Sequence, residues 1–304
     1  MRYFCTCLIY TLKCNFRCSM CGLSCSPKQQ EKMSLDEAKE YVTQSISNNL
    51  FFFGITGGEP LLYENEINEL IEFAVKKGAR KISLTTNCYW AKNYKNTYDI
   101  MNKLKNSGLD HMKISCDKFH MMMVPLEYIK NVLVVSEQIK LRVTLGCTVE
   151  KSEESVFVLL KGLGTSVLGH SITFNGIQEV GRAKNYLANK EKICKVVKNF
   201  CPEGGILTIT PNGNTYACGS LYPLDSDRNC GNLKHENLNV ILNRLQENKD
   251  LQYIMEHGIE DYYECISQKY PDIRFSNACH ICEYIFKGMN HEERMKCQSL
   301  MNKR

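Results

Sequence analysis

Short apolar runs alternate with longer amphipathic segments through the first 175 residues of the chain. The runs typical of buried parallel strands are residues 4–12, 50–55, 81–86, 111–115, 141–149 and 170–174. The segments between them predict helices at 34–48, 63–77, 98–107 and 125–139. Ser34 and Glu37 form a capping-box pattern at the start of the first helix, and Gly78 and Gly108 end the second and third. The pattern predicts βα units around a parallel sheet.

Six βα units are too few to close a barrel tightly, so we expect an α/β fold with a partial (β/α)6 barrel. Active sites in such sheets lie at the carboxyl ends of the strands, where Gly57, Asn87 and Ser115 all fall. After about residue 176 the alternation breaks, and from Cys201 the chain changes to short strands, turns and more cysteines. We therefore predict a barrel over residues 1–180, a bridge over 181–200 that begins Gly181-Arg182-Ala183, and a small α+β domain over 201–304.

Composition narrows the classes of function. The chain has 304 residues, 43% of them hydrophobic, and no apolar run approaches the 18 residues of a transmembrane helix. The N-terminus lacks a signal-peptide pattern, so we expect a cytoplasmic protein without a membrane partner. The net charge of +5 is scattered among acidic residues rather than gathered in a basic stripe, which speaks against a nucleic-acid partner.

Cysteine usage points to metal chemistry, because 17 cysteines in a long, cytoplasmic-looking chain favour metal binding over disulfides. Cys14, Cys18 and Cys21 follow the first predicted strand with the spacing C-x3-C-x2-C. Three thiolates can hold three irons of a [4Fe–4S] cluster and leave the fourth iron open to a small molecule. Structural zinc takes a closed set of four ligands, so the run indicates a catalytic cluster.

A second motif, Thr56-Gly57-Gly58-Glu59-Pro60, follows the second predicted strand. The cysteine run and this strand end, in this order, resemble the radical S-adenosylmethionine (SAM) superfamily. The resemblance implies that the [4Fe–4S] cluster on the three cysteines chelates SAM. It implies that Glu59 and the backbone of Gly57 and Gly58 hold the methionine ammonium. It also implies that three residues contact the ribose: Asn87, Ser115 and Asp117.

Four later cysteines predict a second site. Residues 206–210 and 214–218 predict a hairpin around Pro211-Asn212-Gly213. The cysteines are Cys201, Cys218, Cys279 and Cys282, enough for a closed set of soft ligands. Their spacing resembles the twitch domain of radical SAM enzymes, a shortened relative of the SPASM domain, which implies one auxiliary [4Fe–4S] cluster. A zinc knuckle and reduced structural thiols remain open alternatives.

Within the superfamily the chain resembles the YydG-type epimerases, which act on ribosomally made peptides. The matching segments are residues 24–27, 55–59, 86–90 and 114–120, with Cys201-Pro202 and the late C-x2-C pair. The resemblance implies a short ribosomal precursor peptide as substrate and a reductant such as flavodoxin or ferredoxin. The short stretch before the cysteine run leads us to expect no N-terminal leader-recognition domain.

The epimerase pattern fails where those enzymes carry a hydrogen-donating cysteine, because Gly219 stands there. Cys230 or Cys116 is then the candidate catalytic donor, although a structural role for Cys230 stays open. Otherwise the substrate radical closes a thioether or carbon–carbon link without a donor. Two other interpretations remain: a radical SAM enzyme for a small molecule, and a non-catalytic iron–sulfur or zinc protein.

Overall fold

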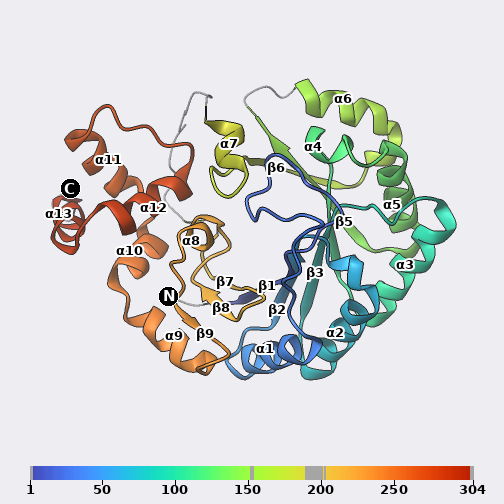
Figure 1. Ribbon diagram of the computed structural model, residues 1–304, viewed down its shortest axis with the longest axis horizontal. Helices are drawn as coiled ribbons and strands as arrows, with labels where there is room; N and C mark the ends of the chain where they lie inside the picture. The colour runs from blue at the N-terminus through green and yellow to red at the C-terminus, as the bar shows by residue number, and fades with distance from the viewer. Residues whose placement is uncertain (1–2, 151–153, 189–200, 202, 302–304) are drawn as a thin grey trace.

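The computed structural model describes all residues except 1–2, 151–153, 189–200, 202 and 302–304. One sheet runs through the molecule in the order β6-β5-β4-β3-β2-β1-β7-β8-β9 (Figure 1). The strands are β1 (Cys5–Thr11), β2 (Phe52–Gly57), β3 (Lys81–Thr86), β4 (His111–Ser115), β5 (Arg142–Val149), β6 (Ser171–Gly176), β7 (Ile206–Ile209), β8 (Asn214–Tyr216) and β9 (Gly231–Asn232).

The first six strands pair in parallel with their neighbours and curve into an open partial barrel, which confirms the predicted fold class. Helices from the connections cover the outer face, as Figure 1 shows. They are α1 (Leu35–Ser47), α2 (Glu64–Lys77), α3 (Tyr94–Ser107), α4 (Lys118–Met121), α5 (Leu126–Ile139) and α6 (Glu154–Leu163), with short 3-10 turns at Pro60–Tyr63 and Gly164–Val167. Their apolar faces bury a core against the sheet that includes Leu8, Ile55 and Leu84.

The residues predicted to begin and end helices have the expected roles in the structure. The Ser34 hydroxyl accepts a hydrogen bond from the Glu37 backbone N–H, and the Glu37 carboxylate accepts one from the Ser34 N–H. Gly78 and Gly108 end their helices in the left-handed conformation, at φ +106° and +108°. The predicted strands at 81–86 and 111–115 have the observed bounds, and the others differ by one or two residues.

The chain beyond residue 200 extends the barrel's own sheet. β7 pairs in parallel with β1, and β8 and β9 follow it as antiparallel strands. Leu207 and Ile209 of β7 lie in the same buried core as the barrel, together with Ile241 of α9. The boundary predicted at residue 201 therefore divides neither the sheet nor this core, and residues 189–200 of the predicted bridge lie outside the described residues.

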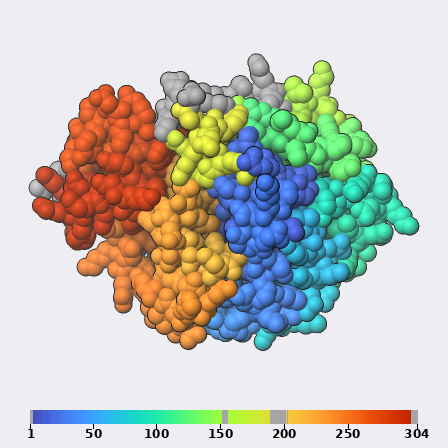
Figure 2. Space-filling view, in the orientation of Figure 1, coloured from blue at the N-terminus to red at the C-terminus, as the bar shows by residue number. Residues whose placement is uncertain are grey.

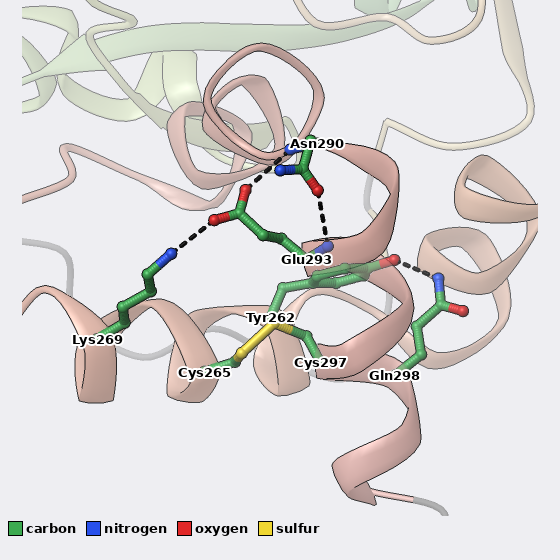
Figure 3. Close-up of a disulfide and its surroundings, with 7 residues drawn as sticks. All are labelled: Tyr262, Cys265, Lys269, Asn290, Glu293, Cys297 and Gln298. Carbon is green, nitrogen blue, oxygen red and sulfur yellow. Dashed lines mark hydrogen bonds and ion pairs between the residues drawn. A yellow bond between two sulfur atoms is a disulfide. The ribbon is translucent and has the colours of Figure 1, made fainter.

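A second apolar core lies among the last helices, seen on the left of Figure 1. The helices after the barrel are α7 (Ala183–Leu187), α8 (Tyr222–Asp225), α9 (Leu238–Glu247), α10 (Lys249–His257), α11 (Glu260–Lys269), α12 (Ala278–Gly288) and α13 (His291–Met301). A disulfide joins Cys265 of α11 to Cys297 of α13 beside Tyr262 (Figure 3), so these two cysteines depart from the expectation of metal binding. None of the helices in the described part of the chain is long and apolar enough to cross a membrane.

Candidate active site

A cavity of about 290 Å³ opens at the carboxyl ends of the parallel strands. All three cysteines of the C-x3-C-x2-C run line it, and four other predicted site residues join them. These are Cys14, Cys18, Cys21, Gly57, Gly58, Asn87 and Ser115. Segments separated by up to 100 residues in the sequence thus meet at one place, because the ends of neighbouring parallel strands share one edge of the sheet.

Residues 14–25, which we call the cysteine loop, are held by polar contacts with the ends of the strands. The Asn87 amide donates to the Cys14 sulfur at 3.6 Å and to the Asn15 side-chain oxygen at 2.9 Å. Burial raises the pKa of Cys14 to about 12. A hydrogen bond from the Cys25 thiol lowers the pKa of Cys21. Cys14 and Cys21 therefore differ in how easily they ionise before any metal arrives.

Cys25 also lines the cavity, a position that sequence reasoning did not assign to the site. The signal was present, since Cys25 follows Cys21 with the same x3 spacing that separates Cys14 from Cys18. The thiol is 3% exposed and bonds to Cys21. We read it as a support for Cys21 within the loop.

The two glycines of the Gly57-Gly58 pair are required by a close approach of backbone. A Cβ atom at Gly57 would overlap the Thr11 carbonyl oxygen, and one at Gly58 would overlap that of Lys13. The Gly58 N–H donates to the Thr11 carbonyl at 2.7 Å. Gly57 also adopts φ +137°, which L side chains rarely tolerate. The glycines thus let β2 lie directly against the chain that leads into the cysteine loop.

Glu59 lies beneath the cavity rather than on its wall. Its carboxylate is fully buried and accepts hydrogen bonds from the Leu61 N–H, the Thr86 hydroxyl and the Asn87 N–H, at 3.0, 2.9 and 2.7 Å. Burial raises its pKa to about 7. These bonds tie the end of β2 to the end of β3 and position Asn87. The expected contact of Glu59 with a ligand ammonium stays a prediction.

Asp117 likewise acts from behind the cavity wall. Its carboxylate caps α4 through the Phe119 and His120 N–H groups, bonds to the Thr148 N–H, and lies 2.8 Å from Nδ1 of His120. Burial opposes its ionisation, but these bonds outweigh burial and lower its pKa. His120 itself lines the cavity. Asp117 therefore positions His120, and its expected contact with the ribose stays a prediction.

Neither candidate hydrogen donor lines the cavity. Cys116 is buried in the outer core, where its thiol pairs with that of Cys147, because successive residues point to opposite faces and Ser115 takes the inner one. The geometry therefore corrects the assignment of Cys116 as a catalytic donor. Cys230 lies near Tyr3, on the side of the second cysteine set, and its carbonyl accepts a bond from Arg244.

The second cysteine set also comes together in space. Cys201 precedes β7, Cys218 follows β8, and Cys279 and Cys282 lie in the first turns of α12. Burial raises the pKa of Cys282 to about 12 and that of Cys279 to about 11, and the charge of Cys201 adds to both shifts. Burial also raises the pKa of Cys218, with further contributions from the other three thiols. Four soft donors separated by up to 81 residues in sequence thus share one buried region.

The distances between the cysteines within each of the two sets indicate which kind of metal site they can form. Among the described residues, no three His, Cys, Asp or Glu side chains gather closely enough to hold a single metal ion. Cluster cysteines each ligate a different iron and stand farther apart than the ligands of one zinc ion. Three thiols around a cavity, with glycine backbone opposite, fit a [4Fe–4S] cluster that leaves room for a ligand.

Comparison with known proteins agrees with this geometry. The family described as the radical SAM superfamily matches residues 8–122. YydG of Bacillus subtilis (strain 168), whose name assigns it to peptide biosynthesis, is 25% identical over 290 residues, covering 91% of this chain and 90% of YydG. The GTP 3′,8-cyclase of Limosilactobacillus fermentum is 33% identical over 114 residues, which is 36% of this chain and 32% of the cyclase.

Solved structures share the fold. The complex of anSMEcpe with AdoMet and the Kp18Cys peptide superposes with a TM-score of 0.60 at 13% identity, covering 99% of both chains. Streptococcus suis SuiB, bound to the precursor peptide SuiA, gives 0.53 at 13% identity, covering 91% of this chain and 76% of SuiB. The family match identifies residues 8–122, which include the cysteine run and the Gly57-Gly58 pair, as a radical SAM domain.

Proposed function

We propose that this enzyme uses SAM to remove a hydrogen atom from a residue of a ribosomally synthesised peptide. The observation that carries the proposal is the similarity to YydG along nearly the whole of both chains, beyond the part that radical SAM enzymes share. The fold is compatible with such a substrate, because SuiB and anSMEcpe hold peptides on it. The similarity to the cyclase covers only about a third of either chain, which gives little support to a nucleotide substrate.

In this proposal Cys14, Cys18 and Cys21 hold the radical SAM [4Fe–4S] cluster. The cluster and SAM, when bound, supply a 5′-deoxyadenosyl radical that takes a hydrogen atom from an unactivated C–H bond. The protein orients the ligand with the glycine backbone at the end of β2. Phe16 and Val124, buried beside the cysteines, shield the cavity from water.

We assign the second cysteine set to one auxiliary [4Fe–4S] cluster, which would exchange the second electron of the reaction. An external reductant such as a flavodoxin or ferredoxin would supply the first electron. The four partly buried thiols support this assignment, and their raised pKa values mean that a bound metal must stabilise the thiolates.

The modification that the peptide receives depends on whether a hydrogen-atom donor lies close to the substrate radical. A side chain at Gly219 would overlap the Glu203 carboxylate, and the Gly219 N–H donates to the Glu203 carbonyl at 3.2 Å. A donor cysteine directly after Cys218 would therefore have to displace the end of the Glu203 side chain. Epimerisation would need a donor elsewhere, with Cys230 as the candidate, while a thioether or carbon–carbon link would need none.

The test is an anaerobic reaction of reconstituted, dithionite-reduced enzyme with SAM and the peptide encoded nearest its gene, in D2O, followed by mass spectrometry. A gain of one mass unit identifies epimerisation, and a loss of two identifies a cross-link. The matched control is the C14A/C18A/C21A variant, which should make neither product nor 5′-deoxyadenosine. If wild-type enzyme forms 5′-deoxyadenosine but leaves every candidate peptide unchanged while converting a small molecule, the peptide proposal is wrong.

A further inference from the structure

Between β6 and α7 the chain passes directly over the cysteine loop. In Figure 2 this segment, in yellow, lies against the N-terminal residues, in blue. A Cβ atom at Gly181 would overlap the Gly22 carbonyl oxygen, and Gly181 adopts φ +55°. Only a residue without a side chain lets the two backbones approach so closely here. We call residues 181–184 the strap.

Arg182 of the strap binds the cysteine loop through four hydrogen bonds. Its guanidinium donates from Nε to the Cys18 carbonyl at 2.9 Å, from one terminal nitrogen to the Ser24 carbonyl at 3.0 Å, and from the other to the Cys25 carbonyl at 2.7 Å. Its backbone N–H donates to the Cys21 carbonyl at 3.1 Å. A rigid planar fork thus fixes three carbonyls of the loop at once, which a lysine cannot do.

The other side of the strap contacts α8, the helix that follows Cys218 of the second cysteine set. The Gly181 N–H donates to Asp225 of α8 at 2.9 Å, and Lys184 pairs with the same carboxylate at 2.5 Å. α8 begins four residues after Cys218. A Cβ atom at Gly22 of the cysteine loop would lie 2.6 Å from the Leu221 side chain, so the loop itself also packs against this region. The strap therefore joins the loop of the first site to the backbone that leaves the second.

We propose that Arg182 is a positioning residue, which fixes the cysteine loop in the shape that accepts the cluster and SAM and places a permanent positive charge beside the cluster thiolates. The inference rests on the proposed function in taking the cysteine run as the cluster site. The loop contains little secondary structure of its own, so its carbonyls depend on partners supplied from elsewhere. Hydrogen bonds from a charged donor are stronger than those from a neutral donor. They therefore help the loop to hold its three cysteine ligands at fixed relative positions.

The test compares R182Q and R182K with a matched arginine control, R80Q. Arg80 lies over the Phe51 ring near the amino end of β3, away from the cysteine loop. Each protein is measured iron-free by circular dichroism and by the rate of alkylation of its thiols by iodoacetamide. Each is then reconstituted and measured for iron per chain, for the reduction potential of its clusters, and for the change that SAM makes in the electron paramagnetic resonance spectrum.

We expect R182Q to fold, to react with iodoacetamide at least threefold faster at Cys18, whose carbonyl Arg182 binds, and to bind SAM at least tenfold more weakly. Its first cluster should have a lower reduction potential, because a neighbouring positive charge has been removed. R182K should restore the potential but not the SAM affinity, since it keeps the charge and loses the fork. R80Q should match wild type in every measurement.

Wild-type alkylation, potential and SAM affinity in R182Q would overturn the inference. If R182Q does not fold, R182K decides, and wild-type SAM affinity in R182K refutes a role for the fork. Failure of the wild-type protein to bind any cluster would instead refute the proposed function. In that case the alkylation rates of the iron-free proteins still decide whether Arg182 orders the loop.

Discussion

Replacing Gly57 with alanine tests how closely β2 approaches the chain before the cysteine loop. An added methyl group meets two separate obstacles. The first is the backbone conformation, at φ +137°, and the second is the Thr11 carbonyl oxygen, which the methyl carbon would overlap. Both obstacles lie where the end of β2 meets the end of β1, beside the hydrogen bond from the Gly58 N–H to the Thr11 carbonyl. Relieving either obstacle must therefore move the cavity wall.

Gly78 provides a control that separates the two effects. It also has a positive φ, at +106°, but a Cβ atom there would meet nothing within 4 Å. G78A should therefore reduce the free energy of unfolding by only about 1–2 kcal/mol, the usual penalty for a left-handed L residue. G57A adds an overlap with backbone, for which overpacking in a rigid region costs a further ~1–3 kcal/mol. We expect a total loss of about 2–5 kcal/mol for G57A.

Urea unfolding of the iron-free proteins, followed by circular dichroism, measures both losses, and SAM-dependent formation of 5′-deoxyadenosine measures the functional effect. G57A should be inactive even where it is folded, while G78A should keep wild-type activity after reconstitution. Equal losses of stability in the two variants, with activity retained in G57A, would show that β2 and the Thr11 backbone are not in close contact.

Three further predictions follow from the two sites. C279A/C282A should lower iron by about one cluster per chain and leave the SAM-responsive cluster in place, as iron analysis and electron paramagnetic resonance can show. C230A should stop deuterium incorporation into the peptide without stopping SAM cleavage, if Cys230 is the donor. Burial raises the pKa of Glu59 to about 7 from 4.5, so the folded state holds a proton that the unfolded state releases. Wild-type stability should therefore fall by about 3 kcal/mol between pH 4.5 and 7 in urea titrations, and E59Q should remove that slope.

The sequence predicted the elements whose local signals agree with the fold. The capping box at Ser34 and the glycines at positions 78 and 108 mark helix ends by short-range geometry, and they appear where expected. The cysteine run and Gly57-Gly58 meet at one cavity because the order of strands and helices dictates where strand ends lie. The helix ends depend on residues within a few positions of one another, whereas the meeting of the two motifs depends on the order of the elements.

The wrong and missing assignments have a common physical cause. Tertiary packing determines which way a side chain points and which groups it contacts. Cys116 was assigned to the site from its place next to Ser115, but the alternation of a strand turns it into the outer core. Arg182 was placed in the bridge but given no role, because its partners are backbone carbonyls about 160 residues away.

The pairing of β7 with β1 determines how the two cysteine sites relate. β1 leads into the first cysteine set at its carboxyl end, whereas Cys201 and Cys218 lie at the amino end of the neighbouring β7. Cys5 pairs with Ile206 and Leu8 with Ile209, so the two sites lie at different levels along parallel strands. With a rise of about 3.3 Å per residue, the six steps from Cys5 to Thr11 separate these levels by roughly 20 Å of strand.

The inner face of the barrel between those levels is polar. Thr85, Lys113 and Thr144 occupy one row of paired positions across β3, β4 and β5. A Cβ atom at Gly146 would lie 2.8 Å from Cε of Lys113, so the lysine side chain runs along the sheet toward the level of Ser115 at the cavity. Inner positions filled with apolar side chains would have packed into a core, as they do in closed barrels. Their polar character instead keeps this row of side chains out of the apolar core of the barrel.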